Sequence, residues 1–146
     1  MKKISFFLMS ALLVALVVMT AGQALAIHWE GTPGMVIKAS KAAVYYYGAD
    51  GKRYVFPTQK TYLTWFADFS DVATLTDEEL AQIPIGGNVT YRPDSRLIKI
   101  NTDPKVYYVD RYGQLRWIKT EAIAITLYGV DWNQLVDDVP DSFFIN

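Results

Sequence analysis

The chain of 146 residues lacks cysteine altogether and has a single histidine, His28. Without cysteine, no disulfide can crosslink the fold, and no thiol can carry a lipid anchor or a zinc–thiolate site. Zinc sites and Ser-His-Asp or Cys-His catalysis require several convergent groups, which one histidine near the start of the chain does not supply. The sequence therefore predicts no metal and no cofactor, and the stability of the fold must come from burial of apolar surface.

An excess of positive charge is also lacking, because 14 Lys and Arg residues face 15 Asp and Glu residues. A protein that binds a phosphate backbone normally carries a basic patch, so we expect no nucleic-acid partner. The sequence contains neither a G-x-x-x-x-G-K-[ST] loop nor a G-x-G-x-x-G turn, and nucleotide binding is unsupported.

The N-terminal segment has the three parts of a secretory signal peptide. Lys2 and Lys3 precede an apolar run from Ile4 to Val18, and Ala24-Leu25-Ala26 supplies a small-residue cleavage site. We interpret residues 1–26 as a signal peptide. An uncleaved membrane anchor is the alternative, since the run approaches the ~20 residues that span a bilayer. After cleavage the protein would be secreted or held at the cell surface, without contact with the membrane.

The rest of the chain resembles itself. After a lead-in segment at 27–34, the tripeptide Val44-Tyr45-Tyr46 returns 62 residues later as Val106-Tyr107-Tyr108, and Gly51 returns as Gly113. The matches keep their order over about 35 residues, which is typical of an internal repeat. We therefore expect one domain, 35–146, made of two repeats at about 35–87 and 96–146.

Each repeat has the pattern of a β-hairpin followed by a short helix. In the first, β-branched and aromatic residues at 44–47 and 52–56 flank Asp50-Gly51, which predicts a two-residue type I′ turn. Thr58 and Thr120 are placed to cap helices that run to Phe66 and Tyr128. A Thr76-x-x-Glu79 capping box predicts a further helix before Pro84.

Two more segments favour a strand pair between the repeats. Residues 88–92 and 96–100 flank Pro93-Asp94-Ser95, a turn-forming tripeptide. The fold class predicted is therefore α+β and β-rich: two β-hairpin-plus-short-helix repeats with antiparallel sheet around one core, joined by the 88–100 strand pair.

The turn assignment also predicts which side chains share a face. A two-residue turn places Tyr47 opposite Tyr54, Tyr45 opposite Phe56, and Tyr46 opposite Val55. The second hairpin would then point four residues to the core: Val106, Tyr108, Leu115 and Trp117. Tyr107, Val109 and Ile118 would share the other face with the charged Arg116, which favours exposure of that face. The large rings of Trp65, Trp117 and Trp132 are assigned to the core.

The elements Leu-Arg-Trp-Ile at 115–118 and Leu-Tyr-Gly-Val-Asp-Trp at 127–132 resemble a known tandem repeat. The resemblance covers about 35–146 and is to hairpin-helix repeats of exported bacterial surface proteins, marked by Arg-aromatic-Ile-Pro and Gly-x-Asp-Trp elements. This chain departs from the pattern at Lys119, where the repeat has proline, and at Ala67, where it has glycine. The resemblance implies architecture and location, and it carries no catalytic residues.

Aromatic residues are the remaining candidates for a binding site, since they make up 14% of the chain. Tyrosine and tryptophan can stack on sugar rings and anchor protein interfaces. The hairpin faces predict a site made of Tyr45, Tyr47, Tyr54, Tyr107 and Arg116. The competing interpretation is that most of these rings belong to the core, because a domain of this size without disulfides needs large side chains inside.

Acidic residues offer a weaker candidate. Asp137 and Asp138 with Asp141 could contribute to a calcium site or a glycosidase pair, but adjacent residues of a strand point to opposite sides. Glu78 and Glu79 lie in the first turn of a predicted helix, where acids stabilise the N-terminus.

These patterns favour an exported, non-enzymatic binding or structural module of the bacterial cell envelope. Its partner would be a cell-surface glycan or a surface protein. Two alternatives stay open: a hydrolase or lyase that cuts envelope polymers through Asp and Glu, and a self-assembling surface-layer or fibre subunit, which would be a homo-oligomer.

Overall fold

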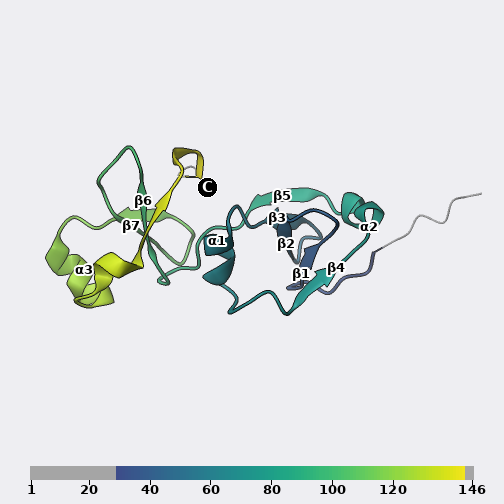
Figure 1. The fold of residues 1–146 in the computed structure, drawn as a ribbon, viewed down its shortest axis with the longest axis horizontal. Helices are drawn as coiled ribbons and strands as arrows, with labels where there is room; N and C mark the ends of the chain where they lie inside the picture. Colours follow the sequence, from purple (N-terminus) through teal and green to yellow (C-terminus); the bar gives the residue numbers. More distant parts are fainter. Residues whose placement is uncertain (1–28, 144–146) are drawn as a thin grey trace, which may run out of the picture.

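The computed structural model describes residues 29–143, so the predicted signal peptide and His28 lie outside the described residues. Within this range the chain forms two sheets, three short α-helices and two 3-10 turns, η1 (Trp132–Leu135) and η2 (Asp141–Phe143) (Figure 1). The β-rich α+β class predicted from the sequence is confirmed.

The first sheet has five strands in the order β4-β1-β2-β3-β5. Its centre is antiparallel, while β4 and β5 pair in parallel with β1 and β3 at the two edges. The strands are β1 (Val36–Lys38), β2 (Val44–Tyr47), β3 (Arg53–Val55), β4 (Val72–Thr74) and β5 (Ile85–Asn88).

The second sheet has four strands in the order β8-β7-β6-β9, again with an antiparallel centre and with β9 parallel to β6. Read from the other edge, this order matches β4-β1-β2-β3 of the first sheet strand for strand. The strands are β6 (Leu97–Ile100), β7 (Tyr107–Val109), β8 (Leu115–Trp117) and β9 (Val136–Val139). A duplication of one unit stays a prediction, and the shared strand order agrees with it.

The strand pair predicted at 88–100 does not form. Ile85–Asn88 pairs with β3 in the first sheet, whereas Leu97–Ile100 pairs with β7 and β9 in the second. Residues 89–96 therefore connect two sheets instead of closing a hairpin. In the second sheet the pairing of β6 with β7 and β9 buries Leu97 and Ile98, whereas β5 is an edge strand of the first sheet with Ile85 64% exposed.

The three helices begin where the sequence predicts. Thr58 caps α1 (Gln59–Leu63) and Thr120 caps α3 (Glu121–Tyr128), each through its side-chain oxygen. Thr76 and Glu79 form both hydrogen bonds of the capping box at α2 (Asp77–Gln82). These N-caps are confirmed, although α1 ends before Phe66.

The hairpin turns are one residue longer than predicted. Gly48 N donates to Lys52 O at 2.8 Å and Gly51 N donates to Gly48 O at 3.1 Å, which closes a three-residue loop. Gly51 has φ +74°, the left-handed conformation that such a loop requires. Because one added loop residue shifts the pairing by one, the predicted register is wrong.

The observed register pairs Tyr45 with Val55, Tyr46 with Tyr54 and Tyr47 with Arg53. Successive side chains on a strand point to opposite faces, so Tyr54 moves to the face opposite Tyr45 and Tyr47.

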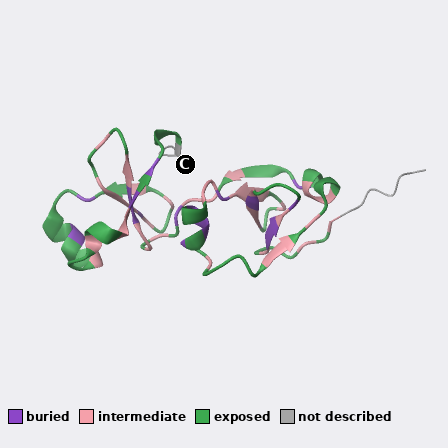
Figure 2. Cartoon of the chain, viewed as in Figure 1, coloured by how far each residue is buried: buried purple, intermediate pink, exposed green. Residues whose placement is uncertain are grey.

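Buried residues form three clusters rather than one core. Figure 2 shows buried segments in both halves of the chain. The cluster in the first half contains Val36, Val44, Phe56 and Tyr62. The two in the second half contain Tyr91, Ile98, Val109 and Val139 on one side, and Leu97, Ile118 and Ala124 on the other.

Of the three tryptophans assigned to the core, only Trp132 packs against a buried cluster, the one with Ala124. Trp65 is 41% exposed and Trp117 is 48% exposed. Their assignment to the core is wrong, because ring size alone does not decide which face of a strand or helix meets a neighbour.

Asp137 on β9 joins the two halves. It is 4% exposed and accepts hydrogen bonds from Arg96 Nε at 2.7 Å, Arg96 Nη2 at 3.0 Å and Lys60 Nζ at 3.1 Å. The Tyr91 hydroxyl donates a further bond at 3.3 Å. Since Lys60 belongs to α1, the carboxylate ties the helix of the first half to the second sheet, and Figure 1 shows α1 lying between them. The neighbouring Asp138 is exposed, which confirms that the two acids point to opposite sides.

The environment of Asp137 sets its charge. Burial alone would raise the pKa of this carboxyl, but the hydrogen bonds from Arg96 and Lys60 outweigh burial and hold the pKa below its usual value. Burial and the adjacent carboxylate raise the pKa of Tyr91 to about 12, so its hydroxyl stays protonated and remains a donor.

We expect Asp137→Asn to lower the free energy of unfolding at pH 7 by about 1.5–3 kcal/mol, because hydrogen bonds to a charged group are lost. The folded-state pKa is depressed, so this stabilisation is present above the unfolded-state pKa of about 3.9 and is lost as the pH falls through the folded value. Urea unfolding at about pH 7 and pH 3 should show the gap to wild type shrinking in acid.

The matched control is Asp138→Asn, which removes the exposed carboxylate that pairs with Lys99 at 3.2 Å. We expect that change to cost under about 0.5 kcal/mol. Equal costs for the two variants, or a gap independent of pH, would contradict the role given to Asp137.

Candidate functional site

The structure does not bring the five predicted site residues together. Tyr45 and Tyr47 share one face of the first sheet, while Tyr54 lies on the other. Each is half-buried and engaged within the chain: Arg53 lies over the Tyr45 ring at 4.9 Å, and the Tyr54 hydroxyl donates to Asp50 Oδ2 at 2.6 Å. Trp29 meets the Tyr47 ring edge-on at 4.6 Å between centroids.

Tyr107 and Arg116 belong to the second sheet and also lie on opposite faces, since Tyr107 pairs with Trp117 and Tyr108 pairs with Arg116. The Arg116 guanidinium donates to the turn residue Asp110 at 2.8 Å. The predicted face therefore consists of separate aromatic contacts on two sheets.

Trp117, an aromatic residue outside the predicted site, lines a groove on the protein surface. A groove of about 460 Å³ opens between the end of β8 and the beginning of α3. This volume lies in the range of about 300–1,000 Å³ that is typical of small-ligand sites. Its lining consists of Pro104, Lys105, Val106, Trp117, Ile118, Lys119, Thr120, Glu121, Ala124 and Trp132.

One helix position at the groove differs between the two halves. The fourth residue after the capping threonine is Tyr62 in α1 and Ala124 in α3, and both are 1% exposed. The Tyr62 ring fills the first half by stacking on Phe69 at 4.2 Å and on Phe66 at 5.1 Å. Ala124 has no ring and is among the residues that line the groove, while Tyr128 and Trp132 pack against its cluster.

Trp117 forms the exposed wall of the groove. Lys105 Nζ lies 5.6 Å and Lys119 Nζ lies 6.0 Å from the centre of its ring. Cations at these distances are attracted to the face of an indole. The residue at the corresponding position of β3 is Val55, so the aromatic ring is particular to the second half.

Charge at the groove is mixed. The hydrogen bond to Asp103 raises the pKa of Lys105, so this lysine stays cationic at neutral pH. Glu121 contributes one carboxylate to the lining, and Thr120 contributes a hydroxyl whose oxygen accepts from Ile123 N at 3.3 Å. Such a set offers a ring face for stacking, with hydrogen-bond donors and acceptors around it.

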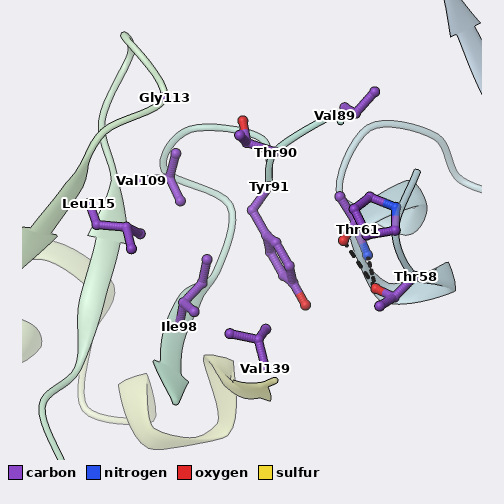
Figure 3. A pocket seen from close by; sticks show the side chains of 11 residues that line it. Thr58, Thr61, Val89, Thr90, Tyr91, Ile98, Val109, Gly113, Leu115 and Val139 are labelled. Atoms are coloured by element: carbon purple, nitrogen blue, oxygen red, sulfur yellow. Dashed lines mark hydrogen bonds between the residues drawn. The ribbon is translucent and has the colours of Figure 1, made fainter. Parts of the chain in front are cut away.

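A second cavity lies at the junction of the halves (Figure 3). The Tyr91 ring projects between Thr58 and Thr61 of the first half and Ile98 and Val139 of the second. The cavity measures about 50 Å³, which is room for a few water molecules. It is a gap in the packing around Tyr91, too small for a sugar or a cofactor.

The groove was not predicted from the sequence, because the alternation of side chains between the faces of the hairpin assigned Trp117 to the core. The lining includes Lys119, whose counterpart 62 residues earlier is Pro57, but this difference by itself does not predict a groove.

Residues 29–143 contain no cluster of three or more His, Asp or Glu side chains able to hold a metal ion. In the same range, none of the helices has the length and apolar character needed to cross a bilayer.

Comparison of the chain with protein-family models, with curated proteins and with solved structures finds no match.

Proposed function

We propose that this protein is an exported, non-enzymatic binding module of the bacterial cell envelope that holds a sugar ring of a cell-surface glycan in the Trp117 groove. The observation that carries the proposal is the half-exposed indole of Trp117, flanked by two lysines in a groove of ligand size. The signal-like N-terminus and the resemblance to exported repeats support the location.

The chemistry of the groove suits a saccharide. A sugar ring presents an apolar C–H face, which can stack on the indole, and a rim of hydroxyls, which can bond to lysine, threonine and glutamate side chains. A concave site with an aromatic wall and a few polar groups is typical of small-ligand recognition, whereas a flat patch would favour a protein.

The hydrolase alternative has less support at this site. Glycoside hydrolysis generally uses two carboxyl groups across the scissile bond, and the groove lining provides one, Glu121. A binding role needs only the ring face and its polar surroundings.

We expect Trp117→Val to weaken glycan binding at least tenfold, about 1.4 kcal/mol, because the stacking surface is removed. Valine is the residue that the first half carries at this position, so the strand should tolerate it. Binding of the exported protein to purified peptidoglycan and cell-wall polysaccharides measures the effect, by pull-down and then by calorimetry with soluble fragments.

The matched control is Tyr112→Val. Tyr112 is 71% exposed and lies 4.8 Å from the Arg111 guanidinium, so it is also an exposed ring beside a cation, but it lies outside the groove lining. Wild-type binding by the Trp117 variant, or an equal loss in both variants, would overturn the assignment of the site.

Filling the groove tests the same proposal by another route. Ala124→Tyr restores the residue found in α1, and we expect the new ring to occupy the groove and abolish glycan binding. Thermal unfolding checks that the fold persists, since overpacking costs about 1–3 kcal/mol. A folded Ala124→Tyr variant with unchanged affinity would place the ligand elsewhere.

A further inference from the structure

Two cations lie at the aromatic wall of the groove, although the net charge of the chain is −1. The Nζ atoms of Lys105 and Lys119 are 5.6 Å and 6.0 Å from the centre of the Trp117 ring, and both residues belong to the groove lining. Attraction between an ammonium group and the indole favours these positions. A ligand that stacks on Trp117 therefore has two positive charges beside it.

The ring and the two cations are all particular to the second half. The residues 62 positions earlier are Ala43 for Lys105, Val55 for Trp117 and Pro57 for Lys119. The strand pairing supports this correspondence, because Tyr45 pairs with Val55 as Tyr107 pairs with Trp117. The first half thus has neither the stacking surface nor the charges beside it.

The two lysines differ in how far their charge is already balanced. Lys105 Nζ donates to Asp103 Oδ2 at 3.1 Å, and Lys105 N donates to Asp103 Oδ1 at 3.0 Å. Lys119 forms no ion pair with any residue from 29 to 143. The charge of Lys119 is therefore the one that a ligand can balance.

The one carboxylate of the groove lining, Glu121, does not balance Lys119. It forms no ion pair with either lysine of the groove in the described part of the chain. Glu121 is the first residue of α3, where the partial positive charge of a helix N-terminus stabilises an acid. The groove is thus polarised, with cations beside the indole and an acid at the helix.

We propose that the saccharide held in the Trp117 groove is acidic, with a carboxylate or phosphate group that binds Lys119 and, more weakly, Lys105. This inference rests on the proposed glycan-binding function and specifies its substrate class. The ring of the sugar would stack on Trp117, and its uncharged hydroxyls would lie toward Glu121.

Charge, rather than stacking, would select the ligand. The C–H face of a neutral sugar and that of an acidic sugar can both stack on an indole. A hydrogen bond between two ionised groups is roughly twice as strong as a neutral one, so the anionic group favours the acidic sugar. Lysine is a compact point charge without the planar fork of arginine, and it suits carboxylate and phosphate alike.

Chemical removal of charge from the glycan tests the inference and separates the two sources of charge. Cell-wall polysaccharides are bound to the exported protein untreated, after reduction of their carboxyl groups to alcohols, and after removal of phosphate with hydrofluoric acid. We expect one of the two treatments to weaken binding at least about tenfold, and high salt to weaken binding of the untreated glycan. The treatment that acts identifies a uronate or a sugar phosphate.

Variants show whether the lost interaction lies in the groove. We expect Lys119→Gln to weaken binding of the untreated glycan at least about fivefold, Lys105→Gln to weaken it less because Asp103 already shares its charge, and Lys119→Arg to retain binding. Glu121→Gln should strengthen binding, since it removes a like charge. The matched control is Lys41→Gln, which removes the same unit of charge from an exposed residue outside the groove lining, and its affinity should change less than about twofold.

Two failures are distinguishable. Binding that survives both chemical treatments, or equal losses for Lys119→Gln and Lys41→Gln, would overturn the acidic substrate and leave the glycan proposal standing. Absence of binding to every untreated polysaccharide would overturn the glycan proposal and this inference together. Thermal midpoints equal to that of the wild type establish that the variants are folded, and Lys119→Gln should make the effective treatment nearly without consequence.

Discussion

The architecture depends on the buried carboxylate of Asp137. A charge removed from water is tolerated only where partners replace its hydration, and here three donors from two segments do so: Lys60 of α1, and Tyr91 and Arg96 of the 89–96 connection. Because Lys60 lies on α1, its bond to this carboxylate contributes to holding the helix against the second sheet, together with the bonds of Thr64 to Arg92 N and of Trp65 to Thr90 O. That contact uses one face of α1 and encloses Tyr91 at the junction.

The two halves share a strand order and a capping threonine, and they differ at the groove of the second half. Tyr62 stacks on Phe69 in the first half, whereas the second half has Ala124 at that helix position and Trp117 where the first half has Val55. A duplication of one unit stays a prediction, and the shared strand order agrees with it. In the first half, the rings of Phe56, Tyr62, Phe66 and Phe69 pack against one another.

The N-caps of the helices were predictable from the sequence, and the pairing register of the strands was not. The capping bonds at Thr58, Thr76 and Thr120 join residues three apart, so the local sequence contains all the information that they need. The hairpin turn at Asp50-Gly51 was located correctly, but its loop has three residues instead of two. The additional loop residue shifts the strand pairing by one, and side chains on a strand alternate between the two faces of the sheet. Tyr54 therefore lies on the face opposite Tyr45 and Tyr47, and the predicted tyrosine site does not form.

The sequence by itself therefore determined the β-rich class, the hairpins, the start of each helix and the opposite orientation of Asp137 and Asp138. Tertiary structure alone decided that Asp137 is buried, that Trp117 is exposed and that a groove opens beside Ala124. The partners of Asp137 lie 41, 46 and 77 residues away in the chain. Whether a side chain is covered depends on such distant segments, and neither periodicity nor residue size encodes which of them will meet.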